Sequence, residues 1–209
     1  MLENYKKHTN GLIEQIEKNI IVYDNKYSNE YNNYGELSNY ISYLRLGYII
    51  GTIGKIPLTL LDVGYGNGGF LKTCSNIIPK LYGSDTDYHY ELPKNIEYIN
   101  NIYEKYYEVI TFFDVLEHFE NIYDIEKIKC TYICISVPNC HSPENDEWFF
   151  NWKHRRKDEH LWHFNKESLI NFMKEIGYTL LTITNIEDSI RKNPNEEINI
   201  ITAIFKKND

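Results

Sequence analysis

A glycine-rich turn that directly follows a buried apolar run is the feature that most restricts how this chain folds. The run covers residues 58–63 and lies between Pro57 and Gly64, which is typical of a strand buried in a parallel sheet. The turn reads Gly64-Tyr65-Gly66-Asn67-Gly68-Gly69, and the pattern predicts a helix from Phe70 onward. Glycines here let the backbone approach a ligand closely, and free N–H groups at a helix start bind anionic groups. The turn therefore predicts a ligand at the end of this strand.

The chain after Pro57 alternates between strand and helix patterns. Strands are predicted over 58–63, 80–84, 96–99, 108–113, 131–137, 178–185 and 198–205. Helices are predicted over 70–78, 121–127 and 166–176, the last with Asn165 as its N-cap and Gly177 as its C-cap. This order predicts an α/β fold, a Rossmann-like seven-stranded mostly parallel sheet with an antiparallel edge strand.

Residues 1–55 are expected to form an N-terminal helical cap in front of the main domain, 56–209. Two groups of apolar residues at helical spacing support two helices: Leu12, Ile13, Ile16 and Ile20, then Leu37, Ile41, Leu44 and Tyr48. A cap in this place would cover the ligand, shape the pocket for a second substrate, or form the contact of a homodimer. Within the main domain, residues 138–164 lack clear periodicity and are expected to form a lid or substrate-binding insertion.

Two carboxylates near the glycine turn bear on which ligand it binds. Asp62 precedes the turn, and Asp85 ends the next strand, where it could accept hydrogen bonds from ribose hydroxyls. Gly64, Gly66 and Gly69 also fit the G-x-G-x-x-G pattern of dinucleotide sites, and a purely structural turn is a further alternative. The placement of Asp62, which could meet a ligand ammonium, and the short second half of the chain favour S-adenosylmethionine (SAM).

Three motifs in order give the chain a family resemblance between residues 58 and 205. Leu60-Leu61-Asp62-Val63-Gly64-Tyr65-Gly66, Gly83-Ser84-Asp85-Thr86-Asp87 and Phe112-Phe113-Asp114-Val115-Leu116-Glu117-His118 resemble motifs of the class I SAM-dependent methyltransferases, type 11/23, the ubiquinone-biosynthesis-like subgroup. The resemblance implies SAM as cofactor, with S-adenosylhomocysteine (SAH) as product. It implies these cofactor-binding residues: Asp62, Gly64, Gly66, Gly68, Asp85, Asn101 near the adenine, Phe113 and Asp114. The short link between the fourth and fifth strands departs from the family pattern.

The lid segment carries most of the candidate catalytic groups. It holds four of the seven histidines and all three tryptophans. A hydroxyl acceptor must lose its proton on methylation, which an imidazole can accept near neutral pH. The candidate bases, in order of preference, are His160, His163, His141 and His118. The candidate substrate-binding residues are Trp148, Trp152, Lys153, Arg155 and Arg156, the cations for a phosphate or diphosphate. Each also has a structural interpretation, as a hydrogen-bonding or packing residue.

The resemblance suggests an O-methyltransferase that acts on a small polar acceptor, a sugar or nucleotide-activated sugar in surface polysaccharide biosynthesis. A metal-assisted RNA 2′-O-methyltransferase is the first alternative, because Asp114, Glu117, His118 and His160 resemble the metal ligands of enzymes that methylate the 3′ ends of small RNAs. Mixed nitrogen and oxygen ligands would suit Mg²⁺, Mn²⁺ or Fe²⁺. A metal is nevertheless not expected. A non-catalytic SAM-binding module is the second alternative.

Composition narrows the partners of this chain. Its 209 residues carry a formal net charge of −8. The chain therefore lacks the broad positive field that favours binding to the phosphate backbone of nucleic acids. A small-molecule substrate is therefore expected rather than nucleic acid. The four cysteines form no C-x-x-C pair, and neither a leader nor a membrane span is evident. We expect a cytoplasmic protein with reduced thiols.

Overall fold

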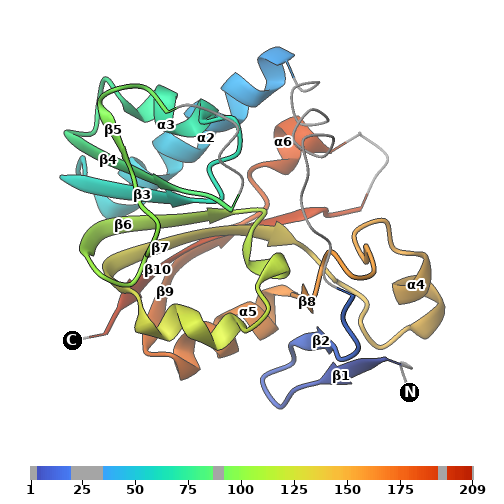
Figure 1. Cartoon of the computed structure of the whole chain (residues 1–209). Coiled ribbons are helices and arrows are strands. Elements are labelled where there is room, and N and C mark those ends of the chain that lie inside the picture. The colour runs from blue at the N-terminus through green and yellow to red at the C-terminus, as the bar shows by residue number, and fades with distance from the viewer. Residues whose placement is uncertain (1–3, 20–34, 87–91, 193–196, 209) are drawn as a thin grey trace.

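The computed structural model describes residues 4–19, 35–86, 92–192 and 197–208. Its main sheet has seven strands in the order β5-β4-β3-β6-β7-β10-β9 (Figure 1). Their bounds are β3 Thr59–Val63, β4 Lys80–Ser84, β5 Ile96–Tyr98, β6 Tyr106–Phe113, β7 Lys129–Pro138, β9 Tyr178–Thr184 and β10 Ile200–Lys207. Strands β5, β4, β3, β6 and β7 are parallel, and β10 is antiparallel to both β7 and β9. The predicted α/β fold, with antiparallel pairing at one edge, is confirmed.

The apolar run of β3 explains how helices come to cover both faces of this sheet. Successive strand residues point to opposite faces, and Leu60 and Leu61 are both fully buried. Leu60 shares its core with residues of α2 (Gly35–Ile53) and α3 (Gly69–Cys74). Leu61 shares the other core with α5 (Lys166–Glu175) and the 3₁₀ helix η3 (Ile122–Lys127). The sheet therefore forms the middle of three layers (Figure 1).

The predicted N-cap of helix α5 is confirmed, and its C-cap is Ile176, one residue before the predicted Gly177. Asn165 accepts a hydrogen bond from the Ser168 amide at 2.8 Å, and the Ser168 hydroxyl accepts one from the Asn165 amide. This reciprocal pair is a capping box, which satisfies two amides that a helix start leaves unbonded. Gly177 follows the helix with a φ of +84°, a conformation that glycine adopts without strain.

The prediction of a helix around Leu12 is wrong as far as the described residues reach. Strands β1 (Tyr5–Lys7) and β2 (Ile13–Gln15) form a hairpin there, and β2 also pairs with β8 (Trp162–His163). Four apolar residues are too few to specify a helix when a distant strand offers backbone partners. Ile20 and most of the expected link to the second helix lie outside the described residues. The second helix is confirmed as α2.

The segment 138–164 is more regular than expected. It contains α4 (Asp146–Asn151), which begins where the Asn145 side chain accepts the Trp148 amide at 3.0 Å, as well as strand β8. A one-turn helix, α6 (Asp188–Arg191), follows β9 and was also not predicted. The three-stranded β1-β2-β8 sheet joins the first residues of the chain to this segment (Figure 1). Among the described helices, none combines the length and apolar character of a membrane span.

Candidate active site

The glycine turn lies at the carboxyl end of β3, where open α/β sheets bind their ligands. Gly64, Gly66 and Gly68 all have positive φ angles, of 69°, 54° and 73°. A Cβ on Gly64 would lie 2.4 Å from a methyl group of Val115, so only glycine fits. The Asp85 carboxylate accepts a hydrogen bond from the Gly66 amide at 2.8 Å. The predicted ribose-binding acid and the predicted turn are therefore in direct contact.

Asp62 lies beneath the turn and is only 3% exposed. Its carboxyl accepts a hydrogen bond from the Thr111 hydroxyl at 2.6 Å. Burial raises the pKa of Asp62 to about 7, although the hydrogen bond from Thr111 and the positive charge of Arg45 oppose this shift. A buried carboxyl with one neutral hydrogen-bond donor is well suited to receive a ligand ammonium group.

The two other groups expected along the cofactor differ in their surroundings. Phe113 ends β6, is buried, and packs edge-on against Phe70 of α3 with the rings 5.0 Å apart. Asn101 follows β5 and is exposed. Its amide group donates to Glu104 at 2.9 Å and accepts the Tyr103 amide at 3.1 Å, so it holds a local turn.

A partly buried ion network that the sequence did not reveal surrounds Asp114. The Arg191 guanidinium donates to both Asp114 oxygens, at 2.9 and 3.0 Å, and Arg45 donates to one of them at 3.2 Å. Both arginines also bind Glu187, which is fully buried and accepts a further hydrogen bond from Ser136. Burial alone would raise the pKa of Asp114, but the two guanidinium groups hold it well below its usual range. Asp114 is therefore an ionised, ion-paired group.

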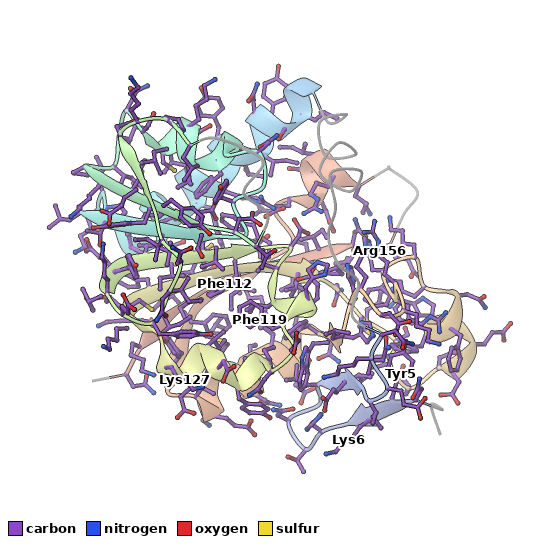
Figure 2. All side chains as sticks on the ribbon, in the orientation of Figure 1. Tyr5, Lys6, Phe112, Phe119, Lys127 and Arg156 are labelled. Carbon is purple, nitrogen blue, oxygen red and sulfur yellow. The ribbon has the colours of Figure 1, made fainter. Side chains whose placement is uncertain are left out.

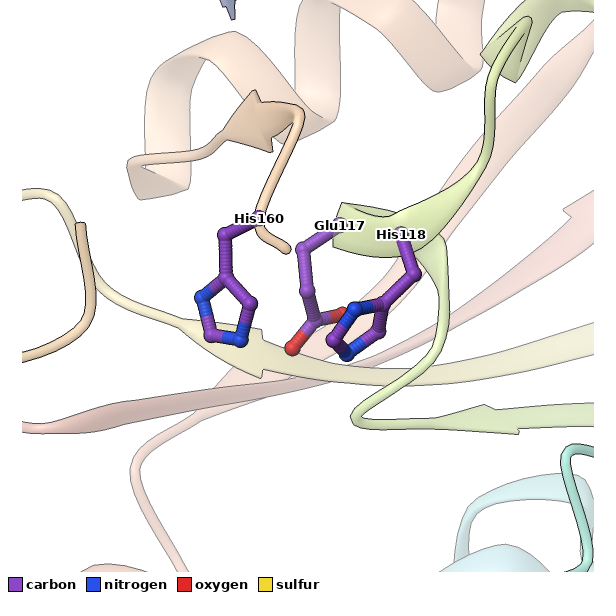
Figure 3. A group of neighbouring side chains, drawn as sticks. All are labelled: Glu117, His118 and His160. Atoms are coloured by element: carbon purple, nitrogen blue, oxygen red, sulfur yellow. The ribbon is translucent and has the colours of Figure 1, made fainter. Parts of the chain in front are cut away.

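Glu117, His118 and His160 form a compact cluster beside this network (Figure 3). The first two belong to the 3₁₀ helix η2 (Leu116–His118), and His160 comes from the lid segment. One ligand-type atom of each lies within 4.8 Å of those of the other two, and the rings of His118 and His160 are 4.7 Å apart. Burial lowers the pKa of His160 to about 2, so its imidazole is neutral. Of the four residues of the metal alternative, three are brought together, and Asp114 is bound by arginines instead.

The remaining candidate bases lie in two different settings. His163 is 2% exposed and is surrounded by the rings of Tyr5, Phe149 and Trp152, and burial lowers its pKa to about 3. His141 lies just after β7 and is partly exposed. Its Nε2 atom is 2.6 Å from a Glu197 carboxylate oxygen. An orienting carboxylate of this kind is a common partner of a catalytic imidazole.

The aromatic candidates for substrate binding gather around one hollow. Trp148 and Trp152 stack with ring centroids 5.3 Å apart, and His141 packs 4.3 Å from Trp148. The hollow has a volume of about 270 Å³, and it is lined by Asn145, Glu147, Trp148, Asn151 and Trp152. The sequence showed that this segment holds the tryptophans, but not that Trp148 and Trp152 stack on each other.

The three candidate cations, Lys153, Arg155 and Arg156, are not among the residues that line this hollow. The Arg155 guanidinium lies over the ring of Phe150 at 5.2 Å, and Arg156 donates to Glu159 at 2.7 Å. Figure 2 places Arg156 at the side of the molecule where the lid segment lies.

Comparison with known proteins was made at the level of sequence and of fold. A family model described as a methyltransferase domain matches residues 41–183. No curated protein matches the sequence.

Several solved structures share the fold. The plantazolicin methyltransferase BpumL, in complex with SAH, has a TM-score of 0.60 at 16% identity, covering 89% of this chain and 91% of that chain. A putative methyltransferase from Bacillus halodurans has a TM-score of 0.57 at 14% identity, covering 78% and 98%. The methyltransferase domain of bacterial CtHen1-C has a TM-score of 0.57 at 15% identity, covering 83% and 100%. At these identities the similarity establishes a common fold.

Proposed function

The chain belongs to the methyltransferase-domain family and is a SAM-dependent methyltransferase, and we propose that its acceptor is a hydroxyl of a small polar ring compound, a sugar or nucleotide-activated sugar. The observation that carries this proposal is the hollow beside the stacked Trp148 and Trp152. An aromatic surface offers a face for a ring to lie on, while the carboxamides and carboxylate of Asn145, Asn151 and Glu147 can bind hydroxyls. A hollow of about 270 Å³ suits a small ligand.

For the cofactor we propose roles that follow the geometry of the glycine turn. The Asp62 carboxylate would meet the SAM ammonium, and Asp85 would bind the ribose hydroxyls while it holds the Gly66 amide. The positive φ angles of Gly64, Gly66 and Gly68 let the backbone approach the methionine part of SAM. Phe113 would line the cofactor, and Asn101 would lie near the adenine.

We propose His141 as the general base, ahead of His160 and His163. The carboxylate of Glu197 orients its imidazole, and the ring packs against Trp148 beside the hollow. Its Nδ1 atom lies 2.9 Å from the Ser142 hydroxyl, a position that an acceptor hydroxyl would take over. His160 and His163 are buried, and their pKa values of about 2 and about 3 make them weak bases.

A transfer assay with labelled SAM tests the acceptor class. Nucleotide sugars and free sugars are compared with RNA 3′ ends and with the monoazolic desmethylPZN analog that BpumL binds in a solved complex. Labelled product from the sugars alone supports the proposal, whereas labelled RNA or labelled analog alone refutes it. SAM binding without transfer to any of these acceptors would also refute the proposed acceptor class.

Two variants test the residues. Trp148→Ala is expected to raise KM for the sugar about tenfold, which corresponds to about 1.4 kcal/mol, because the sugar would lose the apolar indole face on which it lies. Phe150→Ala is the matched control, because Phe150 lies in the same helix but does not line the hollow. His141→Gln should lower kcat by about 10²-fold or more while SAM binding is unchanged. An unaltered kcat in His141→Gln would rule out His141 as the base.

A further inference from the structure

Glu117, His118 and His160 bring three donor groups together from two separate parts of the chain. Glu117 and His118 follow β6 in η2, and His160 reaches them from the lid segment (Figure 3). Their ligand-type atoms lie within 4.8 Å of one another, so an ion between them would be within reach of all three after small side-chain adjustments. None of the three residues lies in the glycine turn or lines the aromatic hollow.

Both imidazoles are oriented as metal-binding histidines are. The Nδ1 atom of His160 lies 2.7 Å from the carbonyl oxygen of His154, and that of His118 lies 3.0 Å from the carbonyl oxygen of Glu159. A carbonyl oxygen only accepts, so each Nδ1 carries the hydrogen and Nε2 is the unprotonated nitrogen. Hydrogen bonds of this kind fix the tautomer and the ring orientation of histidine ligands in metal sites.

The carboxylate of Glu117 gives an independent sign of a missing partner. Glu117 is 1% exposed, and both of its oxygens lack a hydrogen-bond partner among the described residues. A buried carboxylate without a partner is strongly unfavourable, because it loses its hydration and gains nothing in exchange. Arg45 and Arg191 do not supply the missing partner of the Glu117 carboxylate, because both are already bound to Asp114 and Glu187. A cation held by the carboxylate and the two imidazoles would give the Glu117 oxygens a partner.

We propose that Glu117, His118 and His160 bind one divalent first-row transition-metal ion, of the class of Zn²⁺, Co²⁺, Mn²⁺ or Fe²⁺. Two imidazoles and one carboxylate form the donor set of catalytic zinc sites and of non-haem iron sites, whereas Mg²⁺ and Ca²⁺ prefer oxygen donors alone. Three protein ligands leave positions open on the ion. His118 is partly exposed, which gives the ion a route to the site.

Metal titration of the purified, chelator-treated protein tests the proposal without any acceptor. Co²⁺ is added to the unmodified protein and followed by its visible absorption and by calorimetry, with Zn²⁺ as competitor. We expect one ion per chain, displaced by Zn²⁺, and a rise in unfolding temperature that EDTA reverses. Absence of a stoichiometric ion in the unmodified protein would overturn the proposal, whatever the variants do.

Two variants test the ligands, and a third is their control. Glu117→Gln and His160→Gln should each weaken Co²⁺ binding at least hundredfold, while His141→Gln, which changes a histidine outside the cluster, should bind as tightly as the unmodified protein. If Glu117→Gln folds, gains stability and no protein binds an ion, Glu117 is a buried protonated acid and the proposal is wrong. Because metal binding is measured without methyl transfer, its failure leaves the sugar proposal standing, and the reverse holds as well.

Discussion

The buried position of Asp62 makes SAM binding sensitive to pH. Its pKa is raised to about 7 by burial, so the carboxyl gains charge as the pH rises from 6 to 8. If it binds the SAM ammonium, affinity should increase over this range, by at most about tenfold per pH unit. Calorimetry at several pH values, in buffers of different ionisation enthalpy, should show proton release on binding near pH 7.

The Asp62→Asn variant is the control for that experiment. Its affinity for SAM should be lower at pH 8 than that of the unmodified protein, and nearly independent of pH between 6 and 8.

The folding stability of the protein without SAM should change with pH in the opposite direction to its affinity for SAM. Because the pKa of Asp62 is raised in the folded state, its contribution to stability is present at low pH and is lost as the pH rises from about 4 to about 7. A wild-type affinity that is flat across pH 6–8 would exclude a charged contact with Asp62.

Alanine substitutions at Gly64 and at Gly66 distinguish backbone strain from steric overlap when a methyl group is added to the turn. Both have positive φ, so alanine at either costs roughly 1–2 kcal/mol of backbone strain. At Gly64 the new Cβ would also meet Val115 at 2.4 Å, whereas at Gly66 nothing lies within 4 Å. Gly64→Ala should therefore lower the free energy of unfolding by about 1–3 kcal/mol more than Gly66→Ala does. Urea denaturation without SAM measures the difference, and equal midpoints would contradict it.

At the scale of elements, Glu187 ties helix α2 to helix α6. It binds Arg45 of α2 and Arg191 of α6, and it is fully buried. Glu187→Gln removes a charge from between two guanidinium groups, and breaking such a buried pair typically costs about 3–5 kcal/mol. Denaturant unfolding should show this loss. Asp124→Asn breaks an exposed ion pair with Lys127, and should leave the denaturation midpoint nearly unchanged because solvent screens such pairs.

Elements with strong local signals were predictable from the sequence, and those made by distant contacts were not. Strand β3 and its glycine turn carry apolar continuity and a specific order of glycines, and α5 carries its N-cap Asn165 and a glycine just beyond its C-cap. The Leu12 region has only four spaced apolar residues, and it becomes a strand because β8 supplies its backbone partners. Helices α4 and α6 span fewer than two turns, too short for a periodic pattern to form.

The candidate site divides in the same way. The positions of Asp62 and Asp85 beside the glycine turn were predictable, because each has a fixed place relative to a strand end. Arg45, Glu187 and Arg191 were not, since they come from a helix before the sheet and another after β9, with no spacing that links them. His160 could be suggested as a ligand, but its distance from Glu117 depends on how the lid folds back onto η2.

At the scale of the whole molecule, Leu12 shows that the N-terminal hairpin belongs to the main core. It is fully buried in the same cluster as Leu161 and Phe172, on the face of the sheet covered by α5. Leu12→Ala should lower the free energy of unfolding by about 2–5 kcal/mol in a single cooperative transition. Ile16→Ala is the matched control, because Ile16 is 56% exposed, and its effect should stay within about 0.5 kcal/mol. A separate early transition in Leu12→Ala would mean that the hairpin unfolds on its own.

The pairing of β2 with β8 has a consequence for synthesis on the ribosome. Ile13 pairs with His163, so the first strands leave the ribosome long before their partner does. At bacterial or eukaryotic elongation rates of about 5–20 residues per second, that delay lasts on the order of 10–30 s. During it, the apolar side chains of Leu12 and Ile13 face solvent without the cover they have in the finished protein. The N-terminal hairpin therefore exposes apolar side chains on the nascent polypeptide until the strand that pairs with it has been made.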